Sequence, residues 1–140
     1  MTITLRPAVP QDRSFVFDTY NKSHGHVVGA PKFDHFYCRN DTQIILVDDT
    51  KAGFISLIRE GDTTDIQCLF LQPAFQNRGI GTYLLQGIMA HAVAEGTRLT
   101  IATEKTNPAK RLYERLGFVF VRKTKYRFEY EYPNGKKGSA

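Results

Sequence analysis

Long apolar runs are scarce in this chain of 140 residues. One of the longest, Gln43–Val47, covers only a few positions, whereas a membrane-spanning helix needs about 20 apolar residues in a row. The N-terminus also shows no basic leader followed by an apolar stretch and a cleavage site. These absences exclude a transmembrane helix, and we expect a cytoplasmic protein.

Cysteine is nearly missing too. Cys38 and Cys68 are the only two cysteines, which are too few for a disulfide scaffold, and neither belongs to a CxxC or Cys/His cluster with zinc spacing. His24, His26 and His35 follow no metal-binding spacing either. We therefore expect reduced thiols and no metal site.

The overall composition is that of a compact globular domain. Hydrophobic residues make up 41% of the chain, charged residues 24% and aromatic residues 12%, which excludes a disordered tail or a coiled coil as the main architecture. At this length one core is expected. We predict a single domain over residues 1–132, followed by a polar tail at 133–140.

Alternating apolar and polar residues predict three successive strands, at about 43–48, 52–60 and 64–71. The segments between them, 48–51 and 60–63, are rich in residues typical of hairpin turns. An antiparallel meander is therefore predicted for the middle of the chain.

The flanking segments contribute further elements. Ile3 and Leu5 predict a short strand, residues 11–20 a helix, and residues 21–42 an irregular or weakly helical loop. After the meander, four-residue spacing of apolar side chains predicts a helix over 79–95.

The remaining pattern completes a mixed architecture. Leu99, Ile101 and Thr103 alternate as a strand, Asn107 and Pro108 are typical of a helix start, and that helix is expected to end at Gly117. Two last strands are predicted at about 118–122 and 126–132. Helices after the fourth and fifth strands indicate an α/β fold with at least one parallel crossover.

The segment between the third meander strand and the following helix carries the clearest chemical signal. Residues 76–82 read Gln-Asn-Arg-Gly-Ile-Gly-Thr and lead directly into the helix. A glycine-containing turn at a helix N-terminus leaves backbone amides free to bind an anion, and the helix dipole favours negative charge there. A plain helix entry that uses glycines for turning is the alternative.

Two motifs resemble the GNAT superfamily of acyl-CoA-dependent N-acyltransferases. Residues 76–81 are similar to its Gln/Arg-x-x-Gly-x-Gly/Ala signature, and residues 107–118 to its Asn-x-Ala-x-x-Leu-Tyr-x-x-x-Gly-Phe element. The start of the chain, Leu5-Arg6-Pro7-Ala8 with Asp12, agrees as well. The resemblance implies a mixed, mostly antiparallel central sheet of about seven strands flanked by about four helices.

The resemblance also implies a cosubstrate, acetyl-CoA, and the residues that bind it. The pyrophosphate is expected at the loop formed by Gln76, Asn77, Arg78, Gly79, Ile80, Gly81 and Thr82. The pantetheine arm is expected to pair with the backbone of Leu69, Phe70 and Leu71 and to contact Asn107. Helix capping is the alternative role for Asn107.

For the chemistry, the resemblance makes Tyr113 the general acid that protonates the departing thiolate. Packing of the Tyr113 ring in the core is the alternative. The expected general base is Asp65, acting directly or through a water, and Glu104 is the second candidate. Asp65 is equally read as an ordinary carboxylate near a turn.

The predicted function is transfer of an acetyl group from acetyl-CoA to a primary amine by direct attack. The acceptor is unidentified, although four acidic residues would suit an ammonium group if they face it: Asp18, Asp34, Glu129 and Glu131. The main alternative is a catalytically silent CoA-binding sensor or regulatory module. The sequence leaves the oligomeric state, including a homodimer, open.

A nucleic-acid binder is a further alternative because of the charge distribution. The net charge is +5, and residues 98–140 hold 11 Lys and Arg against 4 Asp and Glu. A solvated sheet face accounts for these cations more simply, so we expect no nucleic-acid partner.

Overall fold

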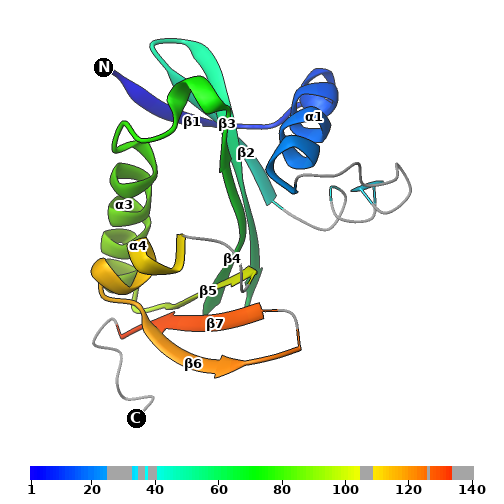
Figure 1. The fold of residues 1–140 in the computed structure, drawn as a ribbon. Helices are drawn as coiled ribbons and strands as arrows, with labels where there is room; N and C mark the ends of the chain where they lie inside the picture. The colour runs from blue at the N-terminus through cyan, green and yellow to red at the C-terminus, as the bar shows by residue number, and fades with distance from the viewer. Residues whose placement is uncertain (25–32, 35–36, 38–40, 105–108, 126, 134–140) are drawn as a thin grey trace. The chain divides into compact units, whose positions relative to one another are not determined.

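The computed structural model describes residues 1–24, 33–34, 37, 41–104, 109–125 and 127–133, which form seven strands and three α-helices (Figure 1). The elements in chain order are β1 (Ile3–Pro7), η1 (Pro10–Asp12), α1 (Arg13–His24), β2 (Asp41–Val47), β3 (Thr50–Glu60), β4 (Thr63–Leu71), η2 (Pro73–Phe75), α3 (Ile80–Glu95), β5 (Arg98–Glu104), α4 (Ala109–Arg115), β6 (Val119–Lys123) and β7 (Arg127–Tyr132). Among these elements, no helix is both long and apolar enough to cross a membrane.

The strands form one mixed sheet with the order β1-β2-β3-β4-β5-β7-β6. Strand β2 pairs antiparallel with β1 and β3, and β7 pairs antiparallel with β5 and β6. Strands β4 and β5 are parallel, and α3 connects them, as a parallel pair requires. The predicted seven-stranded, mostly antiparallel α/β fold with a parallel crossover is confirmed, with three α-helices in the described part of the chain.

The loop predicted over 21–42 is described only in part, because residues 25–32, 35–36 and 38–40 lie outside the described residues. Helix α1 continues to His24, and β2 already begins at Asp41. The last turns of α1 carry an ion pair between Lys22 and Asp18, 3.2 Å apart, at the spacing that supports a helix. Glycine, histidine and proline in this stretch suggested a loop, but they all lie beyond Ser23.

The residue contacts divide the chain into two compact units. We call Met1–Ile58 with Gln67–Ile80 unit 1, and Arg59–Ile66 with Gly81–Ala140 unit 2. The core of unit 1 is an aromatic and aliphatic cluster around Phe33, whose ring lies 4.8 Å from that of Phe17 and 5.5 Å from that of Tyr20. Val16, Ile44 and Phe54 complete this cluster.

The core of unit 2 follows the predicted alternation. Leu99, Ile101 and Thr103 on β5 are buried, and they lie opposite Tyr132, Tyr130 and Phe128 on β7. Helix α3 buries the expected apolar stripe, which includes Leu84, Leu85, Met89 and Ala92. The sequence pattern agrees with the burial here because a strand, with period two, and a helix, with period 3.6, each have two distinct faces.

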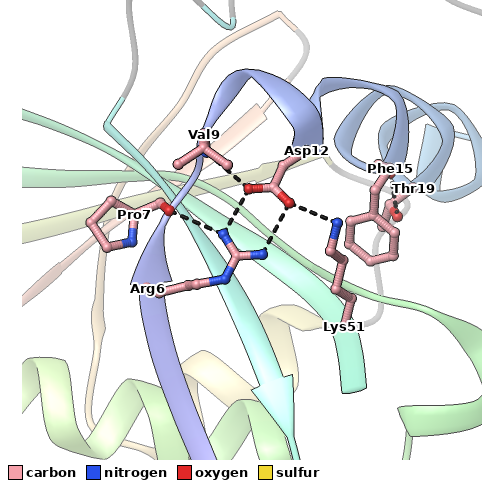
Figure 2. A network of polar contacts seen from close by, with 7 residues as sticks. All are labelled: Arg6, Pro7, Val9, Asp12, Phe15, Thr19 and Lys51. Atoms are coloured by element: carbon pink, nitrogen blue, oxygen red, sulfur yellow. Dashed lines mark hydrogen bonds and ion pairs between the residues drawn. The ribbon is translucent and has the colours of Figure 1, made fainter. Parts of the chain in front are cut away.

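A buried carboxylate fixes the start of the chain in unit 1. Asp12 is 1% exposed, and its oxygens accept hydrogen bonds from Arg6 at 2.7 and 3.0 Å and from the amide of Val9 at 2.8 Å. Lys51 on β3 lies 2.7 Å from the other side of the same carboxylate (Figure 2). The Arg6 hydrogen bonds hold the pKa of Asp12 well below its usual range, although burial opposes them.

Replacing Asp12 with asparagine is expected to lower the free energy of unfolding by about 3 kcal/mol at pH 7. The loss lies at the lower end for a broken buried pair because Arg6 and Lys51 are 36% and 37% exposed and can turn to solvent. Urea denaturation measures it. The control is Asp34→Asn, whose carboxylate is half exposed in its pair with Arg13, and which should cost less than about 1 kcal/mol.

The stability difference between wild type and Asp12→Asn is also expected to depend on pH. A depressed carboxyl pKa stabilises the fold above the unfolded value of about 3.9, and that contribution declines as pH falls below it. The difference between wild type and Asp12→Asn should therefore be about 1 kcal/mol smaller at pH 3 than at pH 7. An equal difference at both pH values would show that the pKa of Asp12 is the same in the native and the unfolded protein, and that the Arg6 contact does not lower it.

Candidate functional site

The loop that precedes α3 has an unusual backbone. Asn77 and Gly79 lie in the left-handed region, with φ of 59° and 79°, which asparagine tolerates and glycine adopts freely. A Cβ atom placed on Gly79 or Gly81 would meet no heavy atom within 4 Å. The loop therefore leaves open space next to the backbone at the start of a 16-residue helix.

This open space has the electrostatics of an anion site. The first amides of α3 have no acceptor within the helix, and the helix dipole adds partial positive charge there. Arg78 adds a full charge: its guanidinium lies 5.5 Å from the centre of the Phe75 ring and donates to the Ala74 carbonyl at 3.3 Å. Among the described residues it forms no ion pair, so its charge is uncompensated.

The loop is tied to the end of β4. Gln76 donates from Nε2 to the Leu71 carbonyl at 2.9 Å. Gln72, which follows Leu71, donates its backbone N–H to the Ala52 carbonyl at 2.8 Å. Its side-chain Nε2 donates to the Thr19 hydroxyl at 2.6 Å. Two glutamine side chains thus hold the β4 end and the following loop in one arrangement, which a nest of amides needs in order to bind a ligand.

The segment Leu69–Leu71 is held against β3. A Cβ at Gly53 would overlap the carbonyl oxygen of Phe70 and lie 2.9 Å from the Cα of Leu71, so only glycine permits this close approach. The Phe70 ring packs on Tyr20 and Phe54, with centroids 6.2 and 5.7 Å apart. The side chain of Phe70 therefore serves the core of unit 1, which leaves only its backbone for a ligand.

The two candidate bases come from neighbouring strands, Asp65 from β4 and Glu104 from the end of β5. Asp65 on β4 is half-buried, pairs with Thr100 on β5, and accepts a hydrogen bond from the Thr100 hydroxyl at 2.5 Å. Glu104 ends β5 opposite Arg127. The side chain of Glu104 lies outside the described part of the chain.

Tyr113 lies on the opposite face. It is 6% exposed, and its ring lies 6.0 Å from Phe118 and 6.2 Å from Tyr130. Tyr130 pairs with Ile101, which points away from the face of Thr100 and Asp65. The structure therefore brings Asp65 to one side of β5 and Tyr113 to the other.

A second buried tyrosine accompanies Tyr113. Tyr130 donates its hydroxyl to Glu114 at 3.1 Å, and burial, with a smaller contribution from Glu114, raises the pKa of its phenol. Tyr130 was not among the site residues expected from the sequence. The signal that could have found it is its alternation with Phe128 and Tyr132, which places all three on the face that α4 contacts.

The family of the chain follows from a direct match. The model of the acetyltransferase (GNAT) domain matches residues 32–120, which is more than half of the sequence and includes the loop, β4, β5 and α4. The chain belongs to the GNAT acetyltransferases. The resemblance seen in its two motifs is thereby confirmed.

Solved structures agree in fold. The PaiA N-acetyltransferase of Thermoplasma acidophilum, solved with coenzyme A, superposes with a TM-score of 0.73 at 15% identity and covers 94% of this chain and 99% of its own. An acetyltransferase of Thermus thermophilus gives 0.76 at 20% identity, with 94% and 96% covered. The ribosomal-protein-S18-alanine N-acetyltransferase of Escherichia coli gives 0.76 at 18%, with 94% of each chain covered.

No curated protein matches the chain in sequence. The solved structures are similar to it at 20% identity or less, so they show that it has a GNAT fold and do not identify its acceptor.

The acidic residues considered for acceptor binding in this GNAT chain all have cationic partners. The pairs are Asp18 with Lys22, Asp34 with Arg13, Glu129 with Arg122 at 2.7 Å, and Glu131 with Arg98 at 2.8 and 3.0 Å. The bidentate Arg98 contact lowers the pKa of Glu131. Each of these carboxylates thus has a cation of the chain beside it, and its contact with an acceptor ammonium stays a prediction.

Two predictions concern residues that the structure describes only in part: the role of Asn107 and the absence of a metal site. Asn107 lies outside the described residues. Within the described ranges, no three His, Cys, Asp or Glu side chains gather as they would around a metal ion.

Proposed function

We propose that this GNAT chain transfers an acetyl group from acetyl-CoA to a primary amine by direct attack. The observation that carries the proposal is the loop before α3, where left-handed residues and open glycines lie beside Arg78, which forms no ion pair among the described residues. A diphosphate is the ligand that suits such a site. The coenzyme A complex of the related PaiA enzyme supports the same assignment.

In this proposal the whole segment Gln76 to Thr82 serves the coenzyme. The amides of Asn77, Arg78, Gly79, Ile80, Gly81 and Thr82 surround the pyrophosphate, and Gln76 holds the loop through its bond to Leu71. The pantetheine arm pairs with the backbone of Leu69, Phe70 and Leu71 and contacts Asn107. Because the Phe70 ring is occupied in the core, its contribution is made by main-chain atoms alone.

The reaction then has a simple balance. The amine nitrogen attacks the thioester carbonyl carbon, a C–N bond forms, and the C–S bond breaks with the electron pair leaving on sulfur. Asp65, directly or through a water, or Glu104 takes one proton from the ammonium before attack, and Tyr113 protonates the thiolate. The second proton, which the nitrogen loses as the amide forms, restores the Tyr113 hydroxyl. Since Asp65 and Tyr113 lie on opposite faces of β5, the proposal puts the thioester at the strand edge, between the two faces.

This proposal treats residues 1–132 as one transferase domain. The acceptor approaches from the face of β5 that carries Asp65, because the other face is covered by the Tyr113 cluster. A silent CoA-binding module would share the loop but would produce no acetylated amine, so binding and turnover have to be measured separately.

Acetyl-CoA is expected to stabilise the native protein. A ligand that binds only the folded state at one hundred times its dissociation constant adds about 2.7 kcal/mol to the free energy of unfolding. Thermal melting with increasing acetyl-CoA measures this effect, and AMP, which lacks both the pyrophosphate and the arm, is the control ligand. A melting temperature that saturating acetyl-CoA leaves in place would contradict the proposal.

A further inference from the structure

A hydroxyl on β5 contacts the candidate base Asp65. Thr100 lies opposite Asp65 in the parallel pair of β4 and β5, and its Oγ1 donates a hydrogen bond to Oδ1 of Asp65 at 2.5 Å. Both side chains are partly exposed, and both residues belong to unit 2. The contact therefore lies within one compact unit and joins a carboxylate on one strand to a β-branched side chain on the next.

Strand register gives Thr100 a carboxylate on each side. On β7 its partner is Glu131, which also belongs to unit 2. A hydroxyl has one proton to donate, so only one of the two carboxylates receives it. In the structure that carboxylate is Asp65.

Arg98 accounts for this choice. Its Nε donates to one oxygen of Glu131 at 3.0 Å, and its Nη2 donates to the other at 2.8 Å. Such a bidentate contact is strong and fixes the orientation of the carboxylate. Arg98 and Thr100 are two residues apart on β5 and so share a face. Arg98 therefore neutralises Glu131 beside Thr100, and the hydroxyl serves Asp65.

The contact with Thr100 supplies what a general base needs. A carboxylate accepts a proton only while it is ionised, and a donated hydrogen bond favours the ionised form. Proton transfer also needs a fixed distance and direction between the two groups. Threonine suits this task because its β-branched side chain has few rotamers. Valine would have nearly the same shape at this position but would carry no donor.

We propose that Thr100 is a positioning residue that holds the carboxylate of Asp65 ionised and correctly directed for removal of the amine proton. Arg98 supports it by binding Glu131, the other carboxylate beside the hydroxyl. This inference rests on the proposed function, and it commits to Asp65 rather than Glu104 as the base. Thr100 itself exchanges no proton with the amine.

The first test is NMR titration of the Asp65 carboxyl carbon in the protein without ligand. Thr100→Val removes the donor and so destabilises the ionised form, and the pKa of Asp65 should rise by about one unit. Thr100→Ser keeps the donor and should titrate like wild type. The matched control is Thr103→Val on the opposite, buried face of β5, which should leave the Asp65 titration unchanged.

The other charged groups on the strands around Asp65 are the same in every variant, so they act equally on each titration. They are Arg59 and Glu60 at the end of β3, Asp62 before β4, Glu104 at the end of β5, and Glu129 on β7 with its partner Arg122 on β6.

The second test is turnover against pH. Panels of amino acids, peptides and aminoglycosides are supplied with acetyl-CoA, and the amine that gives most product with wild type is used for every variant. Thr100→Val should lower kcat by roughly tenfold, because the base is no longer held in place, and should move the acid limb of the kcat profile to higher pH by about one unit. The KM for acetyl-CoA should stay within about twofold of wild type. Thr100→Ser should restore both kcat and the profile.

The outcomes separate this inference from the proposed function. If wild type acetylates an amine but the Asp65 titration is the same in Thr100→Val, the inference is overturned while the proposed function stands. A loss of kcat that leaves the acid limb in place, or that Thr103→Val shares, also overturns it, because either shows a structural role. If wild type acetylates no amine of the panels, the proposed function fails and the inference fails with it. Thr100→Ala replaces Thr100→Val in both tests if the valine variant does not fold.

Discussion

Tyr113→Phe is expected to lower kcat by about 10² to 10⁴-fold, the usual cost of losing a positioned general acid. The ring remains, so its contacts with Phe118 and Tyr130 and the melting temperature should change little. Acetyl-CoA affinity should also persist, because the lost interaction belongs to the transition state. The measurement is steady-state turnover on an amine acceptor, together with a titration of acetyl-CoA.

The matched control is Tyr130→Phe. Tyr130 is buried in the same cluster, but its hydroxyl is committed to Glu114. Its removal should cost about 1 kcal/mol of stability and leave kcat within a few-fold of wild type. Near-normal turnover of Tyr113→Phe, when chemistry limits the rate, would make Tyr113 a packing residue and water the proton donor.

Gly81→Val is expected to abolish measurable acetyl-CoA binding in a folded protein. Nothing lies within 4 Å of the position that its Cβ would take, so the free protein accommodates the side chain. The branched side chain then fills the space that the diphosphate needs and blocks two or more charge-assisted bonds from the loop amides. Such a loss corresponds to a weakening of roughly 100-fold or more.

Gly87→Val on the same helix is the control for Gly81→Val. Gly87 also faces open space, but it lies within the body of α3 and away from its N-terminus. Its substitution should leave the affinity for acetyl-CoA unchanged in a titration. Equal affinity of the folded Gly81 variant and wild type would show that the loop is only a turn.

Local patterns were sufficient to predict most of the fold. The alternation of Leu99, Ile101 and Thr103 predicted the buried face of β5, and the four-residue spacing after Gly79 predicted the buried stripe of α3. These signals are strong because each element has one face in a core. The end of α1 was missed because its last turns carry polar residues, where periodicity gives little information.

The arrangement of the candidate site depended on strand register, which one strand does not reveal. Asp65 and Tyr113 were both singled out from the sequence, but their separation onto opposite faces follows from the pairing of β4, β5 and β7. The partners of Glu129 and Glu131 also depend on cross-strand neighbours. For Thr103, alternation predicts the burial of its side chain, as the structure shows.

The central claim is acetyl transfer to an amine, and product analysis tests it most directly. Wild-type protein is incubated with acetyl-CoA and separate panels of amino acids, peptides with free N-termini or lysines, and aminoglycosides, while free thiol and acetylated amine are quantified together. The account predicts that at least one amine yields thiol and N-acetyl product in equal amounts, and that Tyr113→Phe slows both equally. Acetyl-CoA binding without amine-dependent thiol or acetylated product in any panel would contradict the account and identify a silent coenzyme-binding protein.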